Sequence, residues 1–313
     1  MIGQPVQHTL LERLKLRQSR RRMFVLVVLI PVLAWFMVYM FIPIISVIVY
    51  SFTNAKMQYD SFKFVGLGNY IKMFTADPLI SVALRNTVMA VVIILPSTLL
   101  LALALGAGLN AIGKRSRETF TFVYFLPSVI PMTPIALVWS WLYHPQYGLI
   151  NAMLRGIGLP VQQFLQSSAQ ALVCICVVQI WYTFGYYAVI LLAAMRGVSP
   201  DILEAADIDG ASSLRKFFSI TLPMIKPNVI FVSIMSTIGA FMLFTPVDVL
   251  TLGRGTPGTS TMVLMLKVKI DGIQLGDTGY ASAISILLLV IILFVSLIQW
   301  ILSKEGKREG RRA

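Results

Sequence analysis

Side chains that could do chemistry gather in one long polar loop between two strongly apolar segments. Three carboxylates recur there every third residue, which places them on one side of a short helix: Asp201, Glu204 and Asp207. The small residues Ala205 and Ala206 leave room for another protein surface, and carboxylates pair with basic side chains. The loop is also much longer than a turn needs, so we predict a docking surface for a soluble partner. A solvated hairpin without a partner is the alternative that composition leaves open.

Capping residues define two short helices within this loop. Ser199 suits an N-cap and Pro200 suits the first helical position, so a helix should begin there. Gly210 permits a backbone turn that a side chain would obstruct. A second helix is expected over residues 212–220, and Leu222-Pro223 should mark the return to the next apolar segment.

Two motif matches do not survive inspection of their surroundings. Residues 108–115 nearly reproduce a phosphate-binding loop, but Arg115 replaces the Ser or Thr that would bind magnesium. Residues 253–258 fit G-x-G-x-x-G by letter, without the strand and helix that a dinucleotide site requires. The only histidines are His8, in a tail, and His144, at a helix end, and no His or acid pair stands at a membrane boundary with catalytic spacing. Cys174 and Cys176 lie two apart within one predicted helix and imply no metal site. We therefore expect no catalytic residue, no metal site and no cofactor bound by this chain.

Composition places the chain in a membrane. Of its 313 residues 57% are hydrophobic and 12% are charged, whereas about a quarter are charged in a soluble domain. Crossing a bilayer takes about 20 apolar residues, and helices satisfy their own backbone groups there. Six blocks qualify: residues 24–51, 87–112, 120–142, 171–195, 229–250 and 280–302. We predict an all-α membrane protein in which six helices form one domain over 23–302, between basic tails 1–22 and 303–313.

Basic residues indicate how these helices are oriented. The two tails and the segments 113–119 and 196–228 hold 18 of the 26 Lys and Arg residues. Because cytoplasmic loops carry an excess of these residues, both termini and the polar loop should be cytoplasmic. The net charge of +13 thus flanks membrane segments and forms no face for nucleic acid.

The polar loop also carries a recognisable pattern. Its positions are Glu204, Ala205, Ala206, Asp209, Gly210, Ala211, Phe217, Ile220, Leu222, Pro223 and Pro227. This pattern resembles the EAA loop of ABC-importer permeases, with the spacing of the carbohydrate-type importers. Weaker matches to the maltose- and glycerol-phosphate-type first permease follow in the expected order, at residues 64–70, 147–151, 258–261 and 279–283. Residues 52–85 are too few for the external domain of the maltose-type permease, so the glycerol-phosphate and oligosaccharide branch fits better.

This resemblance implies a fold, partners and a role. The fold would be that of an ABC type I importer permease in a bacterial inner membrane. The partners would be a second homologous permease, two ATPase subunits that bind ATP and Mg²⁺, and an extracytoplasmic solute-binding protein. The loop 199–227 would seat in a groove on an ATPase subunit and transmit its closure, with Glu204 as the polar contact, Ala205 and Ala206 as the close-packed surface and Gly210 as the turn.

A path for sugars should offer aromatic faces with hydroxyl or amide groups near the middle of the membrane. The candidates are Gln179, Tyr182, Tyr186, Tyr187, Ser233, Ser236, Thr237, Phe241 and Asp248. For each aromatic residue, helix packing or the lipid boundary is the alternative role. Gly185 should allow a close helix approach or a kink, and three prolines should keep the third helix from being a straight rod: Pro127, Pro131 and Pro134.

Three other functions stay open on the sequence alone. A glycerol-3-phosphate-type importer shares the same loop. A self-contained ion-driven carrier would need a charge relay within its helices, and Asp248 is the only acid inside a predicted span. A membrane-embedded enzyme would need clustered catalytic groups at a membrane boundary, which the sequence does not offer.

Overall fold

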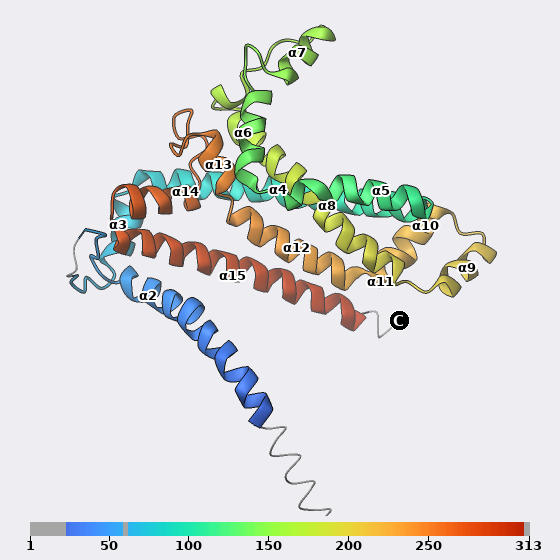
Figure 1. The fold of residues 1–313 in the computed structure, drawn as a ribbon, viewed down its shortest axis with the longest axis horizontal. Coiled ribbons are helices and arrows are strands. Elements are labelled where there is room, and N and C mark those ends of the chain that lie inside the picture. Colours follow the sequence, from blue (N-terminus) through green and yellow to red (C-terminus); the bar gives the residue numbers. More distant parts are fainter. Residues whose placement is uncertain (1–22, 59–61, 310–313) are drawn as a thin grey trace, which may run out of the picture.

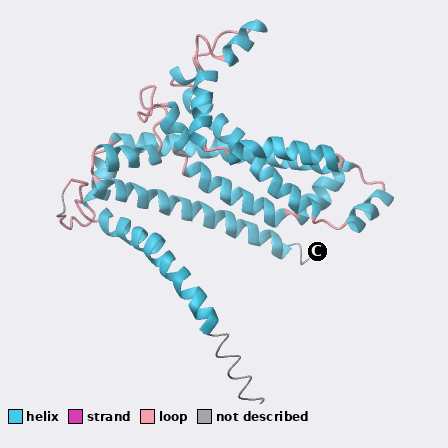
Figure 2. Ribbon diagram, viewed as in Figure 1, coloured by secondary structure: helices cyan, strands magenta, loops and turns pink. Residues whose placement is uncertain are grey.

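The computed structural model describes residues 23–58 and 62–309, and helices are its only regular elements (Figure 2). One isolated antiparallel bridge joins Thr53 and Phe64. The predicted all-α fold class is therefore confirmed for the described residues. The tail 1–22 lies outside them.

Five helices are long and apolar enough to cross a membrane. They are Met23–Ser51, which ends in α2 (Ile42–Ser51), then α4 (Pro78–Ala111), α8 (Ala171–Arg196), α12 with α13 (Lys226–Phe241 and Thr245–Leu250), and α15 (Thr278–Glu309). A sixth span is obtained if a bent pair is counted as one. This pair joins Lys114–Val129, made of α5 (Lys114–Phe125) and η2 (Leu126–Val129), to α6 (Met132–Leu142).

The third predicted span, residues 120–142, is thus broken rather than continuous. Its two halves meet at 98° around Ile130 and Pro131. Ile130 is extended, with ψ at 136°, because a residue that precedes proline is disfavoured in the helical region. Proline also lacks the N–H that would continue the helix. The prediction that the prolines prevent a straight rod is confirmed.

Several helices extend beyond their predicted bounds: α5 begins six residues before the predicted third span and α12 three residues before the predicted fifth, while α4 and α15 extend furthest. α4 begins nine residues before the predicted start, because Asp77 accepts a hydrogen bond from the Leu79 N–H at 2.9 Å and Pro78 occupies the first position. The apolar pattern did not predict these nine residues because Arg85 and Asn86 interrupt the apolar run. α15 continues to Glu309, seven residues into the predicted final tail.

The long helices form one elongated bundle (Figure 1). α4 packs closely along α8, while α12 contacts both α4 and α15. The short elements α3 (Gly68–Thr75), α14 (Leu264–Lys269) and η5 (Ile270–Gln274) lie at one end of the bundle, and α9 (Pro200–Ile208), α10 (Ser213–Lys216), η4 (Phe217–Thr221) and α11 (Leu222–Met224) lie at the other (Figure 1). The first helix diverges from the bundle, and its apolar window is not buried by the chain.

The buried apolar residues form two clusters. The larger one joins α4, α6, α8 and the segment from α12 to α15, and includes Ile94, Ile175 and Leu264. The smaller one joins α4, α8 and α12 to the polar loop, and includes Leu191, Ile225 and Val232. The polar loop is thus packed directly against three of the membrane helices.

Candidate functional site

The polar loop 199–227 folds as two short helical segments joined by a tight turn. α9 ends at Ile208, and Gly210 has φ +74°. The Ala211 N–H donates to the Ala206 carbonyl at 2.9 Å, and the Gly210 N–H donates to the Asp207 carbonyl at 3.0 Å. Gly210, just past the end of this right-handed helix, thus has the left-handed backbone conformation, which glycine favours. Gly210 therefore makes the turn that the sequence predicts.

The two faces of α9 differ. Ala206 is buried and Leu203 is half-buried, so this side lies against the rest of the chain. Glu204 and Ala205 are exposed, as is Asp209 after the helix. Glu204 and Ala205 are thus available to a partner, whereas Ala206 is covered by the chain itself.

The second segment anchors the loop. Ser212 caps α10 by accepting a hydrogen bond from the Arg215 N–H at 3.3 Å. Phe217 and Leu222 then pack against the smaller apolar cluster, while Pro223 is exposed. The predicted helix 212–220 is observed as α10 followed by η4. Since α12 begins two residues after α11, a force applied to α9 would reach α4, α8 and α12 through these contacts.

One edge of α8 faces the break in the third span. The Tyr182 hydroxyl donates to the Ile130 carbonyl at 3.3 Å, and so satisfies a backbone group that the broken helix leaves without a helical partner. Tyr186, one turn further on, is 43% exposed and its ring centroid lies 6.3 Å from that of Phe125. Gln179 lies one turn before Tyr182 and is half-buried. These three candidates share one face of α8.

The other path candidates lie elsewhere. Ser233 and Thr237 both accept hydrogen bonds from the Gln299 amide of α15, at 3.4 Å and 2.8 Å. Asp248 of α13 pairs with Lys269 of α14 at 2.5 Å, and both helices lie away from the polar loop (Figure 1). Three more are buried among apolar side chains or neighbouring helices: Tyr187, Ser236 and Phe241.

Gly185 permits a very close helix approach. Of the two predicted roles, the structure shows the close approach: α8 continues through this position, and a Cβ atom here would lie 1.9 Å from the Tyr124 carbonyl oxygen. That distance is well inside van der Waals contact. Gly185 therefore sets how closely α8 and α5 pack beside the broken span.

Gly185→Ala should lower stability by about 1–3 kcal/mol, the usual cost of forcing extra atoms into a packed site. The measurement is the thermal unfolding midpoint of the purified protein in detergent. Gly239→Ala is the matched control, because nothing lies within 4 Å of a Cβ there. Equal midpoints for the two variants would contradict this account of Gly185.

A buried ionic cluster that was not predicted from the sequence lies at the end opposite the polar loop. Lys267 is 5% exposed, and its ammonium lies 2.8 Å from Asp77 and 2.6 Å from Asp271. The Tyr280 hydroxyl also donates to Asp77, at 2.9 Å. Nearby, Lys72 pairs with Asp277 at 3.2 Å. The cluster joins the start of α4 to α14, η5 and the start of α15.

Burial and pairing shift the pKa values of this cluster. Burial alone would raise the pKa of Asp77, but hydrogen bonds from Lys267, Tyr280 and the Leu79 N–H together hold it below its ordinary value. Burial raises the pKa of Asp271 despite its bond to Lys267. For Lys267, burial is outweighed by the two carboxylates, which raise the pKa and keep the ammonium charged. Only Lys267 and Asp271, four residues apart, gave a local signal in the sequence.

Comparison with known proteins identifies the family. The family described as "Binding-protein-dependent transport system inner membrane component" matches residues 99–306, which include the whole polar loop. The "Probable ABC transporter permease protein YurN" of Bacillus subtilis is 34% identical, over 90% of this chain and 96% of its own length. The "Diacetylchitobiose uptake system permease protein NgcF" of Streptomyces coelicolor is 31% identical, over 95% of this chain and 87% of its own.

A solved structure has the same fold. One chain in a crystal structure of a bacterial alginate ABC transporter, in complex with its alginate pentasaccharide-bound periplasmic protein, superposes with a TM-score of 0.78. The superposition covers 90% of this chain and 94% of the other, at 22% sequence identity. The fold is therefore that of an ABC importer permease, as the sequence predicts.

Proposed function

We propose that this chain is one permease subunit of an ATP-driven importer for a sugar-type solute. The chain belongs to the family of binding-protein-dependent transport system inner membrane components. The relatives support the solute class, since one is described as a diacetylchitobiose permease and another as an arabinooligosaccharide permease. An oligosaccharide or polyol is the solute we favour. Family membership argues against a self-contained ion-driven carrier.

The observation that carries this proposal is the arrangement of the polar loop. α9 presents Glu204 and Ala205 outward, while Phe217 and Leu222 hold the same loop against α4 and α8. A partner that binds the exposed face can therefore move membrane helices without touching them. We assign this face to an ATPase subunit, which places loop 199–227 and both tails in the cytoplasm.

The remaining partners follow from this assignment. A second homologous permease completes a heterodimer that works by alternating access, and an extracytoplasmic binding protein delivers the solute. ATP and Mg²⁺ bind to the two ATPase subunits and not to this chain. The chain itself does no bond-breaking chemistry. Residues 23–302 form the permease domain in this scheme.

The solute path runs along the α8 face that carries Gln179, Tyr182 and Tyr186. The broken third span supports this placement, because irregular backbone at membrane depth is tolerated where it lines a cavity or is buried in protein. Tyrosine rings and an amide at helical spacing offer the stacking and hydrogen bonding that a sugar requires. Ser233 and Thr237, bonded to Gln299, would line it only after that contact opens.

The test is solute-stimulated ATPase activity of the whole complex in lipid, with its binding protein and a panel of neutral oligosaccharides, polyols and glycerol phosphates. Glu204→Ala should lower stimulation about tenfold or more, because removing one partner of a buried charge contact costs roughly 2 kcal/mol or more. Glu118→Ala is the matched control, since Glu118 is an exposed glutamate on α5, outside the polar loop.

The two possible failures of this test have different meanings. Undiminished stimulation in the Glu204 variant would sink the coupling role of α9 while leaving the importer assignment intact. Stimulation by glycerol phosphates alone would replace the neutral-sugar assignment with the glycerol-3-phosphate alternative.

A further inference from the structure

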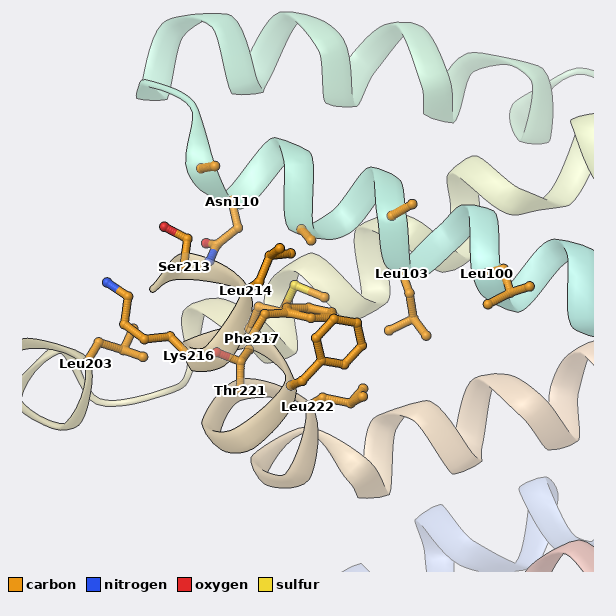
Figure 3. A pocket seen from close by; sticks show the side chains of 15 residues that line it. Leu100, Leu103, Asn110, Leu203, Ser213, Leu214, Lys216, Phe217, Thr221 and Leu222 are labelled. Atoms are coloured by element: carbon orange, nitrogen blue, oxygen red, sulfur yellow. The ribbon is translucent and has the colours of Figure 1, made fainter. Parts of the chain in front are cut away.

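An apolar groove lies between the end of α4 and the second half of the polar loop (Figure 3). It encloses about 690 Å³, within the range of pockets that bind small molecules. Leu100 and Leu103 of α4 form one wall, and Leu214, Phe217 and Phe218 form the facing wall. Much of this surface is uncovered, since Leu100 is 66% exposed and Leu214 is 72% exposed.

The α4 wall of the groove belongs to a membrane-spanning helix. It runs from Leu100 to Ala111, where α4 ends, a length of roughly 17 Å at a rise of 1.5 Å per residue. Leu100 and Leu103 continue the apolar run of this span, so lipid chains are the natural neighbours of this wall.

Basic residues lie at the mouth of the groove and close to it in the sequence. Asn110, Ser213, Lys216 and Thr221 supply its polar lining. Arg215 is adjacent in sequence and makes no ion pair within the described part of the chain. Just beyond α4, α5 begins with Lys114-Arg115.

Acidic groups balance only part of this charge. Asp207 pairs with Lys216, and Glu118 lies 4.0 Å from Lys114. Residues 110–118 and 199–227 together carry six Lys and Arg residues against five Asp and Glu residues, so the excess is one positive charge. Basic clusters beside a membrane helix attract anionic phospholipid headgroups.

We propose that this groove binds an anionic phospholipid, with one acyl chain between α4 and η4 and the phosphate beside Lys216, Arg215 and Asn110. Shape and apolarity of the walls select the chain, and the cationic rim selects an anionic headgroup over a zwitterionic one. The bound lipid would fill the space between α4 and the polar loop. This inference goes beyond the proposed function and does not depend on the identity of the solute.

The first experiment is photo-crosslinking of the assembled complex in nanodiscs of phosphatidylcholine with phosphatidylglycerol. A benzophenone amino acid replaces Leu214, and the control carries it at Ile208, which is 87% exposed on α9 outside the groove. We expect a phosphatidylglycerol adduct at position 214, identified by its mass, at least threefold above position 208. An adduct to peptide instead, from residues 1–22, the second permease or an ATPase subunit, would overturn the proposal.

A second experiment fills the groove. Ala104→Trp places a large ring on an exposed lining position, and Val92→Trp adds the same ring at a 64% exposed site of α4 outside the groove. Native mass spectrometry of the complex should show at least threefold less retained phosphatidylglycerol for Ala104→Trp than for Val92→Trp. Arg215→Gln should lower the ratio of phosphatidylglycerol to phosphatidylcholine in the same measurement. Equal retention in both tryptophan variants, or an unchanged ratio, would overturn the proposal.

Discussion

Lys267→Met should destabilise the protein by about 3–5 kcal/mol, because removing one member of a buried ion cluster leaves uncompensated charge behind. The ammonium of Lys267 lies 2.8 Å from Asp77 and 2.6 Å from Asp271, and the side chain is 5% exposed. Methionine matches its length but leaves both carboxylates without their cation. The measurement is the free energy of unfolding in mixed detergent micelles, by denaturant titration.

Lys269→Met is the matched control for this experiment. Lys269 pairs with Asp248 at 2.5 Å, but the two side chains are 27% and 23% exposed, so water can solvate the remaining carboxylate. Its loss should cost clearly less. A double variant, Lys267→Met with Asp271→Asn, should recover part of the stability, because it removes one of the uncompensated charges. If Lys267→Met and Lys269→Met lowered the free energy of unfolding equally, the buried cluster would contribute no more to stability than a partly exposed ion pair.

What the sequence could predict is whatever depends on local composition. Apolar blocks located the membrane helices, and Gly210 and Ser199 located the turns of the polar loop within a residue or two. Pro131 predicted an interruption of the third span. Its size could not be predicted, because the 98° angle depends on how α6 packs against α13 and α8.

Contacts between distant residues were beyond the reach of such reasoning. Tyr280 and Asp77 are 203 positions apart and share a hydrogen bond. The hydroxyl side chains of Ser233 and Thr237 suggested a place in the solute path, yet each is hydrogen-bonded to Gln299 on another helix. Residue type indicates which chemistry is possible, whereas the partner across the fold decides how a side chain is used.

Asn86→Leu should be the second most damaging substitution, at about 2–4 kcal/mol, because each buried group left without a hydrogen bond costs about 1–3 kcal/mol. Asn86 is 2% exposed on α4, and its amide donates to the carbonyls of Thr259 at 2.9 Å and Met262 at 3.0 Å. These bonds hold the loop before α14 against the membrane helix. Leucine fits the volume but donates to neither carbonyl.

Thr87→Val provides a graded comparison at the next position. Its hydroxyl accepts one hydrogen bond from the Leu264 N–H at 3.0 Å, so a single backbone group is orphaned and the cost should be smaller than for Asn86→Leu. Ser81→Ala, exposed on the same helix and bonded only to the nearby Pro78 carbonyl, should stay within about 0.5 kcal/mol of wild type. The expected loss of unfolding free energy is largest for Asn86→Leu, smaller for Thr87→Val and smallest for Ser81→Ala. This order tests whether α4 holds the loop through its buried polar side chains. Were Asn86→Leu as stable as Ser81→Ala, the loop would depend on apolar packing around Met262 and Leu264 instead.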